Sequence, residues 1–129
     1  MKLLCASMLA LALLSGCGGG GDDTAAVPTP AQTVDGALVG SNGMSLYVFD
    51  KDTAGNGKSV CNDQCAANWP PLYAPDNAQN FGGYSVVARD DGTKQWAYYG
   101  LPLYFWSKDT KPGDRTGDGV GGVWHLARP

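Results

Sequence analysis

The side chains of this sequence that could bind a metal or undergo redox chemistry are those of Cys61, Cys65 and His125. The cysteines have three residues between them, and His125 is the only histidine of the chain. Two thiolates and one imidazole suit copper, so one interpretation is a copper or redox carrier. In an oxidising compartment the same spacing favours a local disulfide, which would stabilise the fold by about 2 kcal/mol. We predict the disulfide and no metal, with the copper set as the alternative.

A second candidate is a glycine-rich loop that begins at Asp50. Asp50, Asp52 and Gly55 match the first, third and sixth positions of a calcium loop. The fifth position is Ala54 and the twelfth is Cys61, where such a loop needs oxygen ligands. All twelve acidic residues of the chain are Asp, which favours turns by bonding nearby backbone groups. We therefore expect backbone-capping aspartates here, with calcium as a weaker alternative.

Catalysis and nucleic-acid binding find little support in the residues present. A serine triad would have to use His125, and no serine lies in a Gly-x-Ser-x-Gly turn. The chain has no Glu that could be tuned as a general acid. Its formal net charge is −3, and its Lys and Arg residues are not clustered as phosphate binding requires. We expect a non-enzymatic protein that needs no cofactor and binds no nucleic acid.

The N-terminus predicts export and a lipid anchor. Lys2 precedes an apolar run over residues 3–14, and Leu14-Ser15-Gly16-Cys17 resembles the cleavage site of a bacterial lipoprotein signal. The run is about 12 residues long, whereas a bilayer takes roughly 20. We expect residues 1–16 to be removed and the thiol of Cys17 to carry a diacylglycerol that holds the protein on the extracytoplasmic side. Gly18 after the cysteine predicts the outer membrane if the cell is Gram-negative.

The mature chain divides into a linker and one folded domain. Residues 17–35 are rich in Gly, Ala, Thr and Pro, which predicts a flexible linker after the lipidated cysteine. Residues 36–129 are enough for a single core. Short apolar runs separated by turn signals predict hairpins over 37–50 and 84–99, followed by a strand over 103–107. One short helix is expected over 62–69, ending at the two prolines that follow.

Two segments of this domain are alike. Residues 43–53 and 100–110 share Gly, Leu, Tyr, a second aromatic, Lys, Asp and Thr at identical spacing. Each segment is followed by a glycine-rich loop and a tryptophan. We infer an internal duplication with repeats over about 37–72 and 84–127. Because side chains alternate along a strand, the tyrosine and the second aromatic of each copy share one face.

The repeats resemble a family of bacterial secreted and lipoprotein repeats defined by a Tyr-x-aromatic-x-x-Asp motif. The motif residues are Tyr47, Phe49 and Asp52 in the first copy and Tyr104, Trp106 and Asp109 in the second. The resemblance covers about residues 37–127. It implies an exported and often lipidated protein of unknown function, and it implies no catalytic residue.

The fold expected from these observations is all-β, with two similar antiparallel repeats packed as a small barrel or sandwich. The expected core contains Leu46, Tyr47, Val48, Phe49, Trp96, Tyr104 and Trp106. All thirteen aromatic residues lie between Tyr47 and Trp124, so some of them, such as Tyr99 and Phe105, could form an exposed patch suited to an envelope protein or a glycan. The alternative is that both faces of the sheet are covered. We predict a lipid-anchored binding or structural module of the cell envelope.

Overall fold

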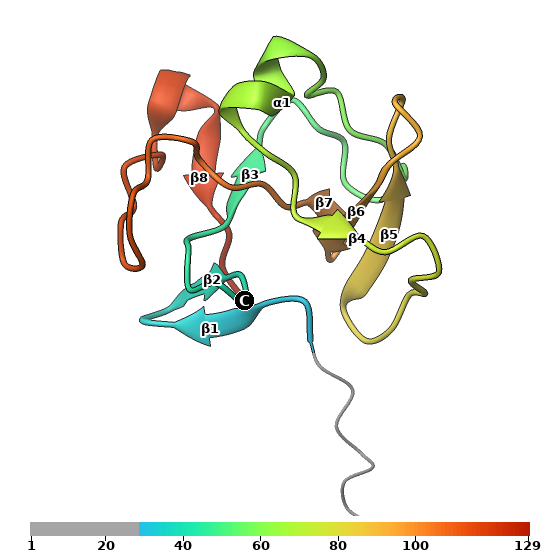
Figure 1. Cartoon of the computed structure of the whole chain (residues 1–129), viewed down its shortest axis with the longest axis horizontal. Coiled ribbons are helices and arrows are strands. Elements are labelled where there is room, and N and C mark those ends of the chain that lie inside the picture. Colours follow the sequence, from blue (N-terminus) through green and yellow to red (C-terminus); the bar gives the residue numbers. More distant parts are fainter. Residues whose placement is uncertain (1–28) are drawn as a thin grey trace, which may run out of the picture.

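The computed structural model describes residues 29–129, so the predicted signal peptide and Cys17 lie outside the described residues. The elements are short, and most are strands (Figure 1). They are β1 (Gln32–Val34), β2 (Ala37–Val39), β3 (Tyr47–Phe49), α1 (Gln64–Asn68), β4 (Tyr73–Ala74), β5 (Tyr84–Ala88), β6 (Lys94–Tyr98), β7 (Leu101–Pro102), the 3-10 turn η2 (Val120–Gly122) and β8 (Trp124–Leu126). The predicted all-β class is confirmed.

The strands form three antiparallel sheets. β1 pairs with β2, and β3 pairs with β8. β6 lies at the centre of the third sheet, between β5 on one side and β4 and β7 on the other. The sheets pack together, but within residues 29–129 they do not close into a barrel.

The predicted hairpin at residues 84–99 is confirmed. β5 and β6 pair from Tyr84 opposite Tyr98 to Ala88 opposite Lys94. The turn between them contains Gly92 at a φ of +89°, a conformation that glycine adopts without steric cost. This hairpin is the most regular part of the domain.

The predicted hairpin at residues 37–50 forms only in part. Val39 bridges to Ser45, and Leu46 N donates to Leu38 O at 3.0 Å. Beyond Leu46 the pairing with β2 ends, because β3 pairs with β8, the last strand, which belongs to the second repeat. Figure 1 shows β3 and β8 side by side although they come from opposite ends of the domain.

β1 lies inside the segment that the sequence assigns to the linker. Its side chains are all exposed, so it carries no apolar pattern by which it could be recognised. Asp35 and Gly36 connect it to β2 with φ values of +49° and +79°. An Asp-Gly pair with two positive φ values is a preferred two-residue hairpin turn, and this was the available signal for β1.

The predicted helix is confirmed as α1, which ends just before Pro70 and Pro71. The predicted strand at residues 103–107 is wrong as a regular strand. This segment instead runs beside residues 68–72 through isolated bonds, such as Phe105 N to Pro70 O at 2.7 Å. Proline lacks the amide hydrogen that a continuous ladder would use on that side. No helix among residues 29–129 combines the length and apolar character that a bilayer crossing requires.

The core has two parts. One is aromatic and lies where the two repeats meet; its buried members are Ala37, Tyr47, Phe49, Cys61, Trp69, Tyr104, Trp124 and Leu126. The other is aliphatic and contains Ala31, Leu38, Leu46, Leu103 and Ala127. Five of the seven predicted core residues are buried, and the other two, Val48 and Trp106, pack against these clusters half-buried.

Candidate functional site

The motif tyrosines pair with the motif aspartates of the opposite repeat. The hydroxyl of Tyr47 donates to Asp109 Oδ2 at 2.6 Å, and the hydroxyl of Tyr104 donates to Asp52 Oδ2 at 2.6 Å. The backbones of the two tyrosines also exchange hydrogen bonds of 2.7 and 2.9 Å. The two copies therefore meet in a pseudo-twofold arrangement centred on Tyr47 and Tyr104.

Each motif aspartate also closes the loop that follows it. Asp52 Oδ1 accepts from the amide of Val60 at 2.8 Å, and Asp109 Oδ1 accepts from the amide of Thr116 at 3.0 Å and from its hydroxyl at 2.6 Å. A carboxylate with several donors suits a buried position, because each unpaired polar atom would cost free energy there. The polar atoms of the motif thus serve the interface between repeats.

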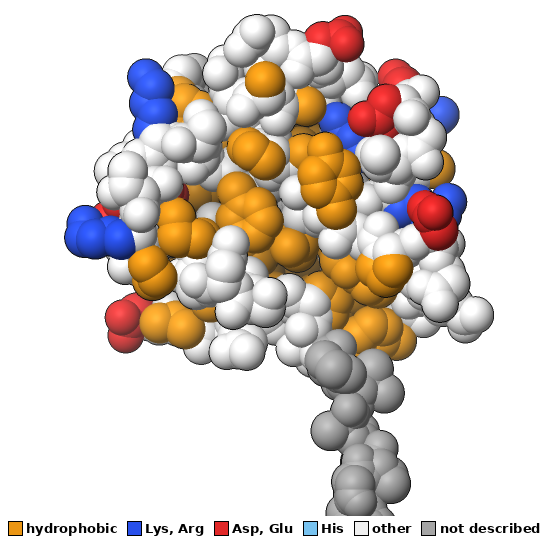
Figure 2. All heavy atoms as spheres, viewed as in Figure 1, with side chains coloured by type: hydrophobic (Ala, Val, Ile, Leu, Met, Phe, Trp, Pro, Cys, Tyr) orange, Lys and Arg blue, Asp and Glu red, His pale blue; other side chains and the backbone are white. Residues whose placement is uncertain are grey.

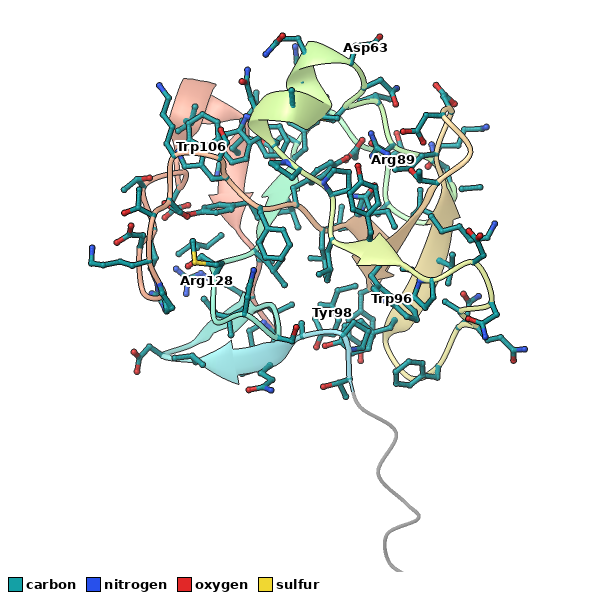
Figure 3. The ribbon with its side chains drawn as sticks, in the orientation of Figure 1. Asp63, Arg89, Trp96, Tyr98, Trp106 and Arg128 are labelled. Atoms are coloured by element: carbon teal, nitrogen blue, oxygen red, sulfur yellow. A yellow bond between two sulfur atoms is a disulfide. The ribbon has the colours of Figure 1, made fainter. Side chains whose placement is uncertain are left out.

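The aromatic residues of the two repeats form one continuous stack. Trp69 and Trp124 stack at 3.8 Å between ring centroids with planes 4° apart. Phe49 stacks on Trp124 at 4.1 Å, and Trp106 stacks on Trp69 at 3.9 Å. The second motif aromatic of each copy therefore packs against the tryptophan of the other copy. Trp106 is the last ring at one end of this stack. Figure 3 shows it near α1.

Burial has a clear effect on the acid–base behaviour of this centre. Tyr47 and Tyr104 are fully buried, and burial, with the hydrogen bond to a carboxylate, raises the pKa of both hydroxyls above the ordinary value of 10.0. Burial also raises the pKa of Asp52, although Tyr104, Val60 and Arg89 oppose it. The tyrosine hydroxyls and aspartate carboxylates of the motif are hydrogen-bonded to one another or to nearby loop residues, so they offer no free reactive atom to a ligand.

Cys61 and Cys65 are joined by a disulfide, as predicted. The bond closes the loop that enters α1, and Cys61 is fully buried in the aromatic cluster. His125 lies on β8, where its Nε2 is 2.8 Å from Asp50 Oδ2. Residues 29–129 contain no group of three His, Cys or Asp side chains placed to hold a metal ion, so the structure does not bring the copper set together.

The aspartates of the proposed calcium loop point to separate partners. Asp52 binds Tyr104 and Val60, whereas Asp50 binds His125. Other aspartates cap the backbone in the same way: Asp91 accepts from the amide of Thr93, and Asp118 accepts from that of Leu126. The prediction of backbone-capping aspartates is confirmed for Asp52, Asp91 and Asp118, whereas the side chain of Asp50 bonds to His125.

Arg89 is a buried cation that sequence reasoning missed. It is 5% exposed and donates to Ser59, Gln95, Asn62 and the carbonyl of Cys61, whereas its Nε has no partner among the described residues. The hydroxyl of Ser59 in turn contacts Tyr104. Because Tyr104 gives its one proton to Asp52, Ser59 must donate to Tyr104, so Arg89 is connected to the motif through a chain of hydrogen bonds.

A cavity of about 430 Å³ opens beside Arg89, between the start of α1 and the β5–β6 turn (Figure 3). It is lined by Asn62, Asp63, Ala66, Arg89, Asp90 and Asp91. Asp91 already binds Thr93, and Asp90 Oδ2 accepts from Asn62. The carboxylates of Asp90 and Asp91 thus already have hydrogen-bond partners, and most donors of the Arg89 guanidinium bond to protein oxygens.

A groove of about 420 Å³ lies between the loop at residues 75–81 and Trp96 of β6. Phe81 and Trp96 form its aromatic part, with ring centroids 5.9 Å apart and perpendicular planes. Exposed carboxamides of Asn77, Gln79 and Asn80 complete the lining. The three carboxamides, unlike the side chains of the motif, are exposed, while Trp96 is buried at the floor of the groove and Phe81 is half-buried. We take this groove as the candidate functional site.

The expected aromatic patch is present only in part. Tyr99 is 72% exposed, as the alternative of an exposed patch requires, and packs edge-on to Tyr98. Phe105 does not belong to an exposed patch, because it packs half-buried against the aliphatic core and against Gly40. Tyr73 on β4 is instead the second exposed aromatic ring, at 54%. Figure 2, in the orientation of Figure 1, shows hydrophobic side chains across the middle of the face in view and charged side chains toward its edge.

The comparisons with known proteins agree with the duplicated architecture. A family model described as a secreted repeat of unknown function matches the chain twice, over residues 29–73 and 85–128. The two matches fall on the two halves that meet at Tyr47 and Tyr104. No curated protein and no solved structure matches the chain. The matched segments cover more than half of the sequence, and the chain therefore belongs to this family of secreted repeats of unknown function.

Proposed function

We propose that this protein is a lipid-anchored module of the cell envelope that acts by binding and not by catalysis. The lipid is a diacylglycerol on Cys17, and in a Gram-negative cell the anchored protein resides at the outer membrane. Support for the anchor comes from the apolar run and the Leu-Ser-Gly-Cys sequence at its end, together with the secreted character of the family.

The groove beside Trp96 is the observation that carries the binding role. The motif residues are occupied with one another, and the sole histidine is paired with Asp50. The groove has a volume typical of ligand sites, and its lining combines aromatic rings with a few polar groups, as such sites do. Trp96 lies on β6, the central strand of the four-stranded sheet, and Phe81 is tied to the start of β5 by its backbone bonds to Tyr84.

Two experiments test the proposal. Cells that express the full chain are fed a clickable palmitate analogue, and label is expected on the wild-type protein and not on Cys17→Ser. The mature protein is then mixed with insoluble envelope material from which detergent has removed the membranes. Sedimentation with this material is expected for wild type and is lost in a variant carrying both Asn77→Ala and Gln79→Ala.

A paired control separates binding from surface chemistry in general. Gln64 and Asn68 are exposed carboxamides on α1 that bond to one another at 3.3 Å and lie outside the groove. The variant with Gln64→Ala and Asn68→Ala should sediment like wild type. Absence of palmitate label on the wild-type protein would refute the anchor, and absence of sedimentation would refute the binding role.

A further inference from the structure

The groove beside Trp96 is neutral, which limits what it can bind. The loop at residues 75–81 contains one charged residue, Asp76, and that residue does not line the groove. A charged ligand would lose its hydration there without gaining an opposite charge. An anionic ligand is further disfavoured by the net charge of −3 of the whole chain. The groove therefore suits an uncharged molecule.

The polar groups of the groove both donate and accept hydrogen bonds. A carboxamide offers a carbonyl acceptor and an amino donor side by side. Asn77 and Gln79 present both groups to the groove, whereas Asn80 presents its amino group, because its carbonyl accepts from Val86. A hydroxyl group has the same dual character. A ligand rich in hydroxyls can therefore satisfy these side chains at several points, whereas an apolar ligand would leave them unpaired.

The aromatic rings supply the second half of the recognition. Phe81 and Trp96 pack edge to face; Trp96 is 9% exposed and forms the floor of the groove, and the half-buried ring of Phe81 forms its aromatic wall. Aromatic faces bury apolar C–H groups with a large gain from removed water. The pyranose ring of a sugar has such C–H groups on its faces and hydroxyls around its edge, so it matches rings and carboxamides at once.

The loop that carries the carboxamides is held in shape before any ligand arrives. The amide of Ala78 donates to Pro75 O at 2.9 Å, and Phe81 and Tyr84 exchange backbone bonds of 3.0 and 2.9 Å. Asn80 Oδ1 also accepts from the amide of Val86 at 2.9 Å, which ties the loop to β5. A site that is already ordered loses less conformational entropy when a ligand binds.

We infer that the groove between residues 75–81 and Trp96 binds an uncharged oligosaccharide, with the carboxamides on its hydroxyls and the ring of Phe81 on its C–H face, above the floor that Trp96 forms. This inference rests on the proposed function and names its ligand class. The groove volume of about 420 Å³ leaves room for a short stretch of a glycan chain to lie along it.

The test titrates the mature, full-length protein with defined sugars in a detergent that has no sugar head group. The probes are N,N′,N″-triacetylchitotriose, cellotriose and maltotriose, and binding is measured by calorimetry and by the intrinsic tryptophan fluorescence of the protein. At least one neutral probe should bind, and the variant with Asn77→Ala and Gln79→Ala should bind it on the order of tenfold more weakly. The variant with Gln64→Ala and Asn68→Ala should retain wild-type affinity.

Two further probes make the outcome decisive. An oligogalacturonate and a proline-rich peptide are expected not to bind, because the groove offers no cation and its carboxamides suit hydroxyls. The inference is overturned if no neutral sugar binds, if the peptide or the acidic sugar competes with it, or if both double variants bind like wild type. Sedimentation with envelope material that still depends on Asn77 and Gln79, without sugar binding, would preserve the proposed function and reject only the glycan.

Discussion

The hydroxyl of Tyr47 donates to Asp109 across 62 positions of sequence, at a distance of 2.6 Å. Its counterpart, Tyr104, does the same to Asp52. Each repeat thus supplies the donor for one pair and the acceptor for the other. This exchange explains why the motif requires a tyrosine and an aspartate at a fixed spacing, since neither residue has its partner within its own copy.

Removal of either hydroxyl should weaken the domain. Tyr47→Phe leaves Asp109 Oδ2 and the amide of Gly117 short of a partner, and Tyr104→Phe does the same to Asp52 and Ser59. The expected loss in the free energy of unfolding is about 1–3 kcal/mol for each variant, which is typical for a buried group left unsatisfied. Urea unfolding followed by tryptophan fluorescence measures it.

Tyr73→Phe is the matched control for these two variants. The ring of Tyr73 is 54% exposed on β4, so water can replace whatever its hydroxyl contacts. Its free energy of unfolding should change by less than about 0.5 kcal/mol. If the three variants unfold at the same urea concentration, the exchanged pairs do not stabilise the junction between repeats.

The same pairs predict a loss of stability in alkali. The folded-state pKa values of Tyr47 and Tyr104 lie above their ordinary value of 10.0, so the folded domain holds these protons longer than the unfolded chain does. Stability from this source is complete below pH 10.0 and declines as pH rises from there toward the folded-state values. The urea concentration at the unfolding midpoint should therefore decrease as the pH is raised from about 10 to about 12.

Tyrosinate absorbance assigns this alkaline effect to the two buried residues. Tyr47 and Tyr104 should ionise only together with unfolding, and a variant with both changed to Phe should lose this late phase. Its urea midpoint should also depend less on pH in the alkaline range. Ionisation of all six tyrosines in the folded protein near pH 10 would contradict the buried arrangement.

Reduction of the Cys61–Cys65 disulfide should lower the free energy of unfolding of the domain but leave it folded. The bond closes a loop with a sequence separation of only 4, for which chain entropy accounts for about 2 kcal/mol. Thermal unfolding with and without a thiol reductant measures the difference. Cys61→Ala combined with Cys65→Ala should reproduce the reduced value, and complete unfolding of either form would show that the bond carries the fold.

Much of the fold could be predicted from local signals, and the junction between repeats could not. The Asp90-Asp91-Gly92 turn and its flanking strands carry their pairing in adjacent residues, and the prolines after α1 stop it directly. The pairing of β3 with β8 depends on contacts between the first and last strands. No turn signal or periodicity in either segment specifies such a distant partner.

The candidate site divides in the same way. The motif marked six residues as important, but their spacing alone gives no sign that Tyr47 finds its acceptor in the other copy. The groove was missed because its rim consists of ordinary loop carboxamides, and only the fold brings them beside Trp96. Arg89 was missed because a single arginine at the end of a strand usually lies in solvent.

Arg89→Lys should destabilise the domain although it preserves the charge. The guanidinium donates to four separate oxygens from Ser59, Gln95, Asn62 and Cys61, and an ammonium cannot reach such a set from one point. The expected loss is about 1–3 kcal/mol in the free energy of unfolding. Arg128→Lys is the control, because Arg128 is exposed and bonds only to Gly36 O among the described residues. Equal effects of the two variants would show that the network around Arg89 contributes little.

Gly117→Ala tests the tightness of the aromatic stack. A Cβ atom at this position would lie 2.9 Å from the rings of both Trp69 and Tyr47, which are buried and cannot move aside. Gly117 does not have a positive φ, so the substitution adds volume without backbone strain. Overpacking of this kind costs about 1–3 kcal/mol, which differential scanning calorimetry resolves.

Gly83→Ala provides the matched comparison, because a Cβ there would come within 2.7 Å of Tyr99, a closer approach than at Gly117. Tyr99 is 72% exposed, so its ring can turn into solvent and relieve the contact. Gly83 also lacks a positive φ. We therefore expect Gly83→Ala to unfold within about 0.5 kcal/mol of wild type despite its shorter distance. If Gly83→Ala proves the more damaging change, the distance alone sets the cost, and the stack around Trp69 is looser than its geometry indicates.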